Sequence, residues 1–234
     1  IQLKKFRTLH SKTAGHPEYG LLKCIETTTG PLGQGIANAV GMALSEKILS
    51  QKFGKSIVDH KTWVLAGDGC LMEGISQESI SIAGHLGLNK LILIFDDNEI
   101  SIDGHTSLTT SDDQMKRFKA SNWNTISVNG HDFNEIDRAF KKASSSDKPT
   151  LIACKTIIGF GSPNKSGMSA SHGSPLGFEE AKKTKEKLNW KHPNFEIPKK
   201  ILFTWRKFGI KGSKKRIFWE KRLKNHKERN QFLS

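Results

Sequence analysis

Asp68 and Asn98 are polar residues that each follow an apolar, strand-like segment of the chain. Asp68 lies in a Gly-Asp-Gly sequence directly after residues 63–66, and Asn98 comes shortly after residues 91–94. Open α/β sheets bind ligands at the carboxyl ends of their strands, so we expect the two side chains to meet there. A carboxylate oxygen and an amide oxygen suit a hard cation such as Mg²⁺, which takes its remaining ligands from water and phosphate. The pair therefore predicts a metal-diphosphate clamp.

The alternative interpretation of Gly-Asp-Gly is a plain turn, in which glycine supplies unusual dihedral angles and aspartate bonds its own backbone. The context favours the clamp. The sequence follows a strand and precedes a helical pattern, and the same order of strand and polar loop recurs before Asn98.

Other candidates for chemistry lie in loops. Residues 27–35 form a glycine-rich entry into a helix, where the backbone could approach a ligand closely or simply turn. His16 and His172 are flanked by small residues, which favours access for hydrogen bonding and proton transfer near neutral pH. An incidental surface position is the alternative for each histidine. The same alternative applies to three other charged residues, Lys165, Glu73 and Glu78, of which the glutamates could simply favour a helix dipole.

Helical and strand-like segments alternate along the chain, which predicts an α/β fold with a mostly parallel sheet covered by helices on both faces. In the first helix, apolar residues recur every fourth position from Ile36 to Ile48. In the second, Ile75, Ile82 and Ala83 are expected on the inner face. The expected helices cover residues 33–53, 74–86, 112–118 and 134–143, and the expected strands cover residues 62–66, 90–95, 125–128 and 151–155.

The formal charge of +14 belongs to the last part of the chain. Residues 1–181 hold 19 Lys/Arg and 19 Asp/Glu, whereas residues 182–234 hold 18 and 4, so we expect a neutral domain followed by a basic helical tail. Such a tail can bind phosphate backbones. The preferred interpretation is a solvated amphipathic helix or linker, because its apolar residues have helical spacing: Ile201, Leu202, Trp205, Phe208, Ile217, Phe218 and Leu223.

The cysteine pattern suits a reducing compartment, since Cys24, Cys70 and Cys154 are odd in number and show no paired metal-ligand spacing. No apolar run approaches the length of a membrane span. The chain begins at Ile1 with neither a charged start nor an apolar signal region, so we expect a cytoplasmic protein whose true start is missing.

Taken together, the motifs resemble transketolase over nearly the whole chain. The Gly-Asp-Gly and Asn pattern is shared with other thiamine-diphosphate enzymes such as pyruvate dehydrogenases, whereas Gly-Pro-Leu-Gly-Gln-Gly and His-Gly-Ser-Pro-Leu point to transketolase. The resemblance implies the diphosphate domain of the thiamine-diphosphate-binding fold, with the basic tail leading toward a second domain. The segments that carry it are residues 16–18, 29–35, 67–75, 96–104, 155–165 and 172–177.

The resemblance also implies roles for individual residues. Asp68, Asn98 and the backbone carbonyl of Ile100 would hold Mg²⁺, or Ca²⁺ or another divalent ion, on the diphosphate of thiamine diphosphate. The backbone of Gly69 would contact that diphosphate. Gly30, Pro31 and Leu32 would line the thiamine site. His16 and His172 would be the catalytic residues that contact the ketose donor and the developing intermediate, with His172 also near the diphosphate. Glu73 and Glu78 would belong to a carboxylate network that reaches a dimer partner, with Glu73 also at the cofactor.

The implied activity is transfer of a two-carbon ketol unit between sugar phosphates, as in the pentose phosphate pathway. Glu99 departs from the family pattern, but we expect it to be tolerated because the neighbouring ligand is a backbone oxygen. The family's earlier histidines and its pyrimidine-binding domain have no counterpart in the sequence. We therefore expect the chain to be inactive alone and to act as a homodimer or with a chain that carries the pyrimidine domain. A non-catalytic remnant or assembly module is the alternative.

Overall fold

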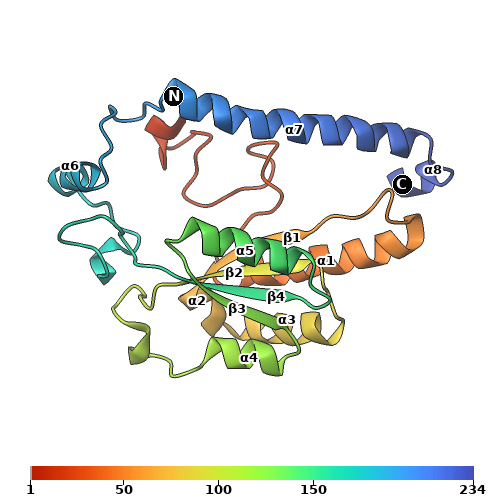
Figure 1. Ribbon diagram of the computed structural model, residues 1–234, viewed down its shortest axis with the longest axis horizontal. Coiled ribbons are helices and arrows are strands. Elements are labelled where there is room, and N and C mark those ends of the chain that lie inside the picture. Colours follow the sequence, from red (N-terminus) through yellow and green to blue (C-terminus); the bar gives the residue numbers. More distant parts are fainter. Residues whose placement is uncertain (1) are drawn as a thin grey trace. The chain divides into compact units, whose positions relative to one another are not determined.

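The computed structural model describes residues 2–234, and Ile1 lies outside the described residues. Within this range four strands form one parallel sheet in the order β1-β2-β4-β3 (Figure 1). The expected α/β fold is confirmed, and each strand lies within two residues of its predicted bounds. The strands are β1 (Thr62–Gly67), β2 (Leu91–Asp97), β3 (Asn124–Asn129) and β4 (Thr150–Lys155).

The four expected helices of the domain are also confirmed within two residues. They are α1 (Gln34–Phe53), α3 (Gly74–His85), α4 (Gln114–Ala120) and α5 (Phe133–Ser144). The other helices are α2 (Asp68–Met72), α6 (Phe178–Lys187), α7 (Lys199–Lys224) and α8 (Arg229–Leu233), with short 3-10 helices η1 (Gln2–Lys5), η2 (Thr106–Leu108) and η3 (Ser169–Ser171).

The strand order places the ends of β1 and β2 side by side. Gly67 is in register with Asp96, so the residues that follow the two strands emerge at one edge of the sheet. Strand β4 lies between β2 and β3, and Lys155 at its end is in register with Asp97. Three strand ends therefore converge on the same edge.

Helices α1, α3 and α4 cover one face of the sheet (Figure 1). Leu91, Leu93 and Phe95 of β2 point to this face, because successive side chains of a strand alternate between the two faces. Ile80 of α3 and Phe118 of α4 are fully buried against them. This side of the sheet holds the larger of the two cores in the domain.

Helix α5 covers the opposite face, where Ile92 and Ile152 pack with Ala139 and Ala143. Its first turn is capped by Asp132, whose Oδ1 accepts hydrogen bonds from the backbone amides of residues 134 and 135 at 2.8 and 3.1 Å. Such a cap satisfies amide groups that have no partner inside the helix. Helices thus cover both faces, as expected.

The inner face of α3 differs from the expectation. Ile75 and Ile82 are exposed, and of the three expected core residues only Ala83 is buried. The reason is the side that α3 turns to the core, which leaves Ile75 and Ile82 outside and buries Ser76, Ser79, Ile80, Ala83 and Gly84. Within this side only Gly84 must be small, because a β-carbon there would lie 1.7 Å from the carbonyl oxygen of Ser121. Ile48 in the second half of α1 is likewise exposed rather than buried.

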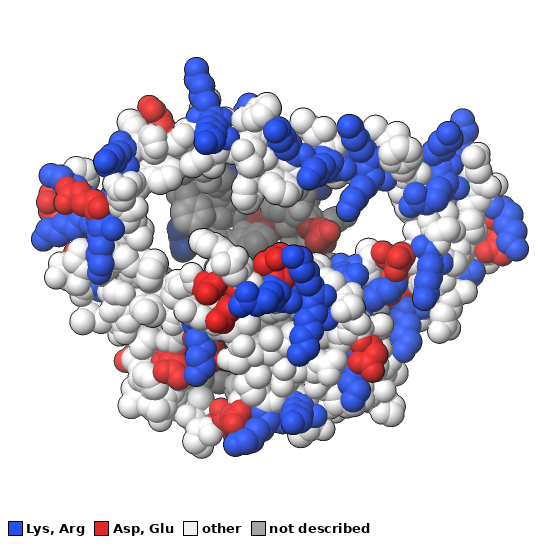
Figure 2. Space-filling model, in the orientation of Figure 1, with Lys and Arg blue, Asp and Glu red and all other residues white. Residues whose placement is uncertain are grey.

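The chain divides into two compact units, residues 1–44 with 61–190 and residues 45–60 with 191–234. In the second unit the expected basic helix is present as α7, and Figure 2 shows Lys and Arg side chains along it. Trp219 and Leu223 of α7 pack with Phe53 and Ile57, and Trp219 Nε1 donates to the carbonyl of Ile57 at 2.7 Å. That residues 1–181 form the domain and residues 182–234 a separate tail remains a prediction.

Nowhere in residues 2–234 does a helix combine the length and the apolar character that crossing a membrane requires.

Candidate functional site

Asp68 and Asn98 lie at the ends of neighbouring strands, as predicted. Asp68 is the first residue of α2, directly after β1, and Asn98 follows β2 directly. The backbone amides of Asn98 and Glu99 donate hydrogen bonds to the Asp68 carboxylate, so the two halves of the expected clamp touch each other. The fold therefore brings a carboxylate and an amide side chain to one point at the edge of the sheet.

The Asp68 carboxylate has an oxygen without a partner. Its Oδ2 is buried and accepts no hydrogen bond among the described residues. Burial raises the pKa of Asp68 to about 6, the nearby charge of Asp97 acts in the same direction, and the amide hydrogen bonds oppose both. A buried anionic oxygen with no donor is costly unless a cation or a proton satisfies it. A divalent ion at this oxygen would provide that charge.

Asp97 adds a second carboxylate next to the first. Burial raises its pKa, Lys155 opposes this effect, and the charges of Glu99 and Asp96 reinforce it. The edge of the sheet is therefore an acidic environment in the absence of a bound cation, which favours binding of a positive ion.

Residues 98–100 form a tight turn after β2, and hydrogen bonds fix the positions of its oxygen atoms. Asn98 Oδ1 accepts from the backbone amide of Ile100 at 3.0 Å, and Glu99 has a φ of +61°. Glu99 O accepts from Thr106 N at 2.9 Å, and Ile100 pairs with His105 in an isolated antiparallel bridge. The turn is held at both ends, which restricts the positions of the Asn98 side chain and the Ile100 backbone.

The glycine-rich segment meets the clamp residues from the other side. A β-carbon at Gly69 would lie 3.1 Å from Leu32 Cδ1, and one at Gly30 would lie 3.0 Å from His16 Cγ. Leu32 is thus in contact with the Gly-Asp-Gly turn, and the His16 ring packs on Gly30. Glycine at these positions permits an approach that a side chain would block.

Gly33 fits against the start of α3 in the same way. It has a φ of +81°, and a β-carbon there would lie 2.9 Å from Glu73 Cβ and 3.0 Å from Ser76 Oγ. Glu73 itself is exposed at the junction of α2 and α3. The fold therefore brings His16 together with five of the predicted cofactor-site residues, which are Gly30, Leu32, Asp68, Gly69 and Asn98.

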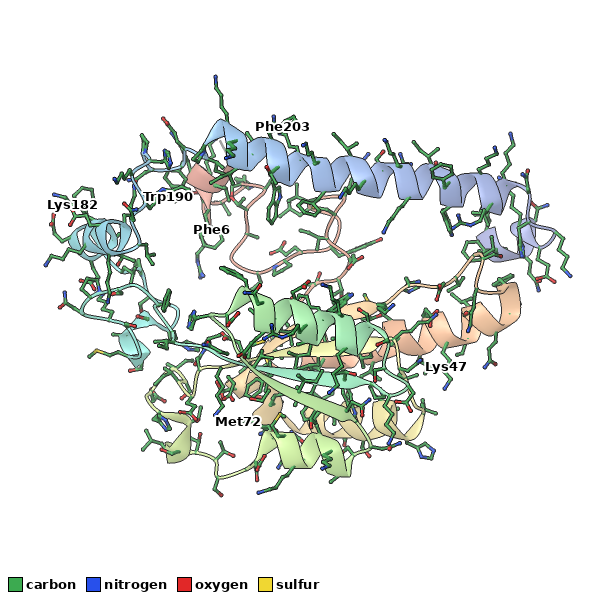
Figure 3. The ribbon with its side chains drawn as sticks, in the orientation of Figure 1. Phe6, Lys47, Met72, Lys182, Trp190 and Phe203 are labelled. Atoms are coloured by element: carbon green, nitrogen blue, oxygen red, sulfur yellow. The ribbon has the colours of Figure 1, made fainter. Side chains whose placement is uncertain are left out.

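A cavity of about 540 Å³ opens beside the clamp. Asp68 and Asp97 line one side of it, and the loop that contains His105 lines another. Met72, at the end of α2 (Figure 3), also lines the cavity, and its sulfur accepts a hydrogen bond from Thr109 Oγ1 at 3.8 Å. The cavity is mostly polar in its lining, as a site for a charged ligand would be.

For the remaining predicted residues, the contacts found in residues 2–234 include none with the residues around Asp68 and Asn98. Pro31, Glu78 and His172 are exposed, and the backbone amide of His172 donates to the carbonyl of Ser169, the first residue of η3. Lys165 Nζ donates to the carbonyl of Leu176 at 2.9 Å, which ties the lysine to the segment before α6. The roles expected for Pro31, Glu78 and His172 remain predictions.

Sequence patterns missed Asp96, which contacts Asn98, and Thr156, which contacts Asp96. Asp96 accepts a hydrogen bond from Asn98 Nδ2 at 3.1 Å, and Thr156 Oγ1 donates to the other oxygen of Asp96. Asp96 lies within the segment of residues 96–104, two positions before Asn98, and this spacing places both side chains on one face of an extended chain, which is the signal that could have found it. Thr156 is 60 residues away in sequence and could not be found from local spacing.

Among the described residues, no group of three His, Cys, Asp or Glu side chains could hold a metal ion. The expected ligand set is compatible with this finding, because it contains one carboxylate, one amide oxygen and one backbone oxygen. Oxygen ligands of mixed type, completed by water and phosphate, are usual for Mg²⁺.

The fold and the site define an α/β cofactor-binding domain in which acidic and amide side chains gather at the carboxyl ends of the parallel strands. Residues 1–234 match the family model described as transketolase, thiamine diphosphate binding domain. The chain belongs to this family.

Relatives and solved structures agree with that assignment. The chain is 53% identical over 222 residues to a transketolase of Rhodobacter capsulatus, which covers 95% of the chain and 33% of that relative. It is 55% identical over 231 residues to a transketolase of Buchnera aphidicola, with 97% and 35% covered. The crystal structure of transketolase from Campylobacter jejuni has a TM-score of 0.95 at 41% identity and covers 99% of the chain and 37% of its own length. The chain thus spans about a third of the length of the curated relatives it matches.

Proposed function

We propose that this chain is the diphosphate-binding part of a transketolase that transfers a two-carbon ketol unit from a ketose phosphate to an aldose phosphate. One observation carries the proposal. The buried Asp68 Oδ2 has no hydrogen-bond partner in residues 2–234, and it lies on a carboxylate that already touches the Asn98 turn. A divalent cation that bridges this edge to a diphosphate would satisfy the oxygen.

Three groups of the chain would hold the cation. They are the carboxylate of Asp68, the amide oxygen of Asn98 and the backbone carbonyl of Ile100. Asn98 Oδ1 accepts one hydrogen bond from Ile100 N and retains a second lone pair, which is free for a metal. Mg²⁺ is the preferred ion, and Ca²⁺ or another divalent ion would use the same oxygens.

The glycine-rich segment would bind the organic part of thiamine diphosphate. Leu32 contacts Gly69, so a ligand held by the Gly-Asp-Gly turn would lie next to the loop of residues 30–32. His16 packs on Gly30 and is exposed, which places an imidazole where a ketose donor could accept or donate a hydrogen bond. Thiamine diphosphate supplies the carbanion chemistry of two-carbon transfer, whereas the residues bind and orient the reactants.

The partners in the proposal are sugar phosphates and either a second copy of the chain or a chain that carries a pyrimidine-binding domain. A cytoplasmic setting is part of the same proposal. It is supported by three free cysteines, of which Cys154 is buried and Cys24 is exposed.

Calorimetric titration of the chain with thiamine diphosphate in the presence of Mg²⁺ tests the proposal. We expect binding that disappears without Mg²⁺ and in the Asp68→Ala variant. Asp103→Ala is the matched control, because Asp103 is an exposed aspartate in the loop after the Asn98 turn. Binding by Asp68→Ala with the affinity of the unaltered chain would contradict the proposed site.

A further inference from the structure

Asp96 connects the Asn98 turn to the loop after β4. Its Oδ2 accepts from Asn98 Nδ2 at 3.1 Å, and its Oδ1 accepts from Thr156 Oγ1. The two donors come from the ends of β2 and β4, which are neighbours in the sheet. Both carboxylate oxygens of Asp96 are therefore used, one by each strand end.

The Asn98 amide has only one orientation that satisfies these contacts. Its nitrogen faces the Asp96 carboxylate and its oxygen faces the amide of Ile100 at 3.0 Å. A rotated amide would place its oxygen against the carboxylate and its nitrogen against an N–H group, so both hydrogen bonds would be lost. Asp96 thus determines that oxygen rather than nitrogen is presented on the Ile100 side.

Thr156 is itself held in place. Its backbone amide donates to the carbonyl of Asp97 at 3.1 Å. The next amide, that of Ile157, donates to His131 Nε2 at 3.0 Å, and the His131 ring stacks on Phe160 with 4.1 Å between centroids. The hydroxyl that orients Asp96 therefore belongs to a segment with a defined backbone position.

We propose that Asp96, oriented by Thr156, is a positioning residue that keeps the amide oxygen of Asn98 available to the divalent cation. The inference rests on the proposed metal-diphosphate function of the site. Residues that orient metal ligands typically change metal affinity by 10–100-fold when they are substituted, because a ligand that must be reoriented binds less tightly. Substitution of Asp96, or removal of the Thr156 hydroxyl, should therefore raise the Mg²⁺ concentration that cofactor binding requires.

The test measures thiamine diphosphate binding to the chain by calorimetry at a series of Mg²⁺ concentrations. The readout is the Mg²⁺ concentration that gives half-maximal binding. We expect this concentration to rise at least about tenfold in Asp96→Leu and by about threefold to tenfold in Thr156→Val. Thr156→Ser retains the hydroxyl, so it should stay within about twofold of the unaltered chain.

A merely structural role would give a different pattern. Thr156→Val would then lower the melting temperature of the metal-free chain, while its Mg²⁺ requirement would equal that of Thr156→Ser, and this result would overturn the inference. If Asp96→Leu does not fold, the comparison of Thr156→Val with Thr156→Ser is sufficient to test the inference. Binding that requires no Mg²⁺, or that survives in Asp68→Ala, would instead refute the proposed function, so the two failures are distinguishable.

Discussion

The imidazole of His16 lies directly against Gly30, and a β-carbon at residue 30 would come within 3.0 Å of His16 Cγ. The contact joins a loop histidine to the glycine-rich segment that enters α1. It means that the position of His16 depends on the absence of a side chain at residue 30, and that a small change there can be used to displace the ring.

Gly30→Ala is therefore expected to weaken thiamine diphosphate binding. The new methyl group would push the His16 ring away, and the φ of +153° disfavours any side chain. Gly20→Ala is the matched control, since Gly20 also has a positive φ, of +87°, but nothing lies within 4 Å of the added carbon. Both variants should lose about 1–2 kcal/mol of unfolding free energy, and calorimetry should show a loss of affinity in Gly30→Ala alone. Equal affinities for the two variants would contradict the role assigned to the contact.

Asp68→Asn should separate stability from ligand binding. Burial and the charge of Asp97 raise the pKa of Asp68, so its ionised form destabilises the metal-free chain at neutral pH. The neutral amide removes this cost, and we expect the metal-free variant to unfold at a higher urea concentration than the unaltered chain. Mg²⁺ with thiamine diphosphate at 100 times the dissociation constant should stabilise the unaltered chain by about 2.7 kcal/mol and should leave Asp68→Asn unchanged. Stabilisation of both proteins by the ligands would rule out Asp68 as the anchor of the cation.

Glu180 should make stability depend on pH in the acid range. Hydrogen bonds from Ser162 Oγ, Asn164 N and Asn164 Nδ2 lower the pKa of Glu180 from an ordinary 4.5 to about 2. A depressed pKa means that the ionised form stabilises the fold, so this contribution is complete above about pH 4.5 and is lost as the pH falls toward 2. Glu180→Gln should be less stable than the unaltered chain at pH 7, and the difference should shrink between pH 4.5 and pH 2.

Urea unfolding at pH 7, 4.5 and 3 measures this effect. Glu179→Gln is the control, because Glu179 is the exposed neighbour in the first turn of α6. It should differ little from the unaltered chain at every pH. A stability difference for Glu180→Gln that is independent of pH would show that the carboxylate charge is unimportant.

Two glycines in helices should respond to alanine in opposite directions. At Gly84 in α3 a β-carbon would lie 1.7 Å from Ser121 O, so Gly84→Ala must separate α3 from the segment before β3. We expect a loss of about 3 kcal/mol or more, at the upper end of the cost of overpacking. Gly41 in α1 has nothing within 4 Å, and Gly41→Ala should gain about 0.5–1 kcal/mol from helix propensity. Chemical denaturation of both variants checks the pair, and similar effects would mean that the contact at residue 121 is not tight.

The sequence by itself determined the alternation of helices and strands, because apolar periodicity reflects which side of each element faces a core. It also determined that Asp68 and Asn98 belong together. Each follows an apolar strand, and β1 and β2 are parallel neighbours in the sheet. Predicting their proximity required the rule that parallel strands end at the same edge, and the expectation that strands consecutive in the chain lie side by side.

Only the tertiary structure decided the contacts that cross between distant segments. Strand β4 inserts between β2 and β3, and this order brings Thr156 to Asp96 across 60 residues of sequence. It also decided that Ile82 is exposed, because α3 packs on the core through the side that carries Ile80 and Ala83. Local periodicity records which residues are apolar, but it does not record strand order or the distance between packed backbones. Strand order brings Thr156 to Asp96 and thereby supports the orientation of the Asn98 amide.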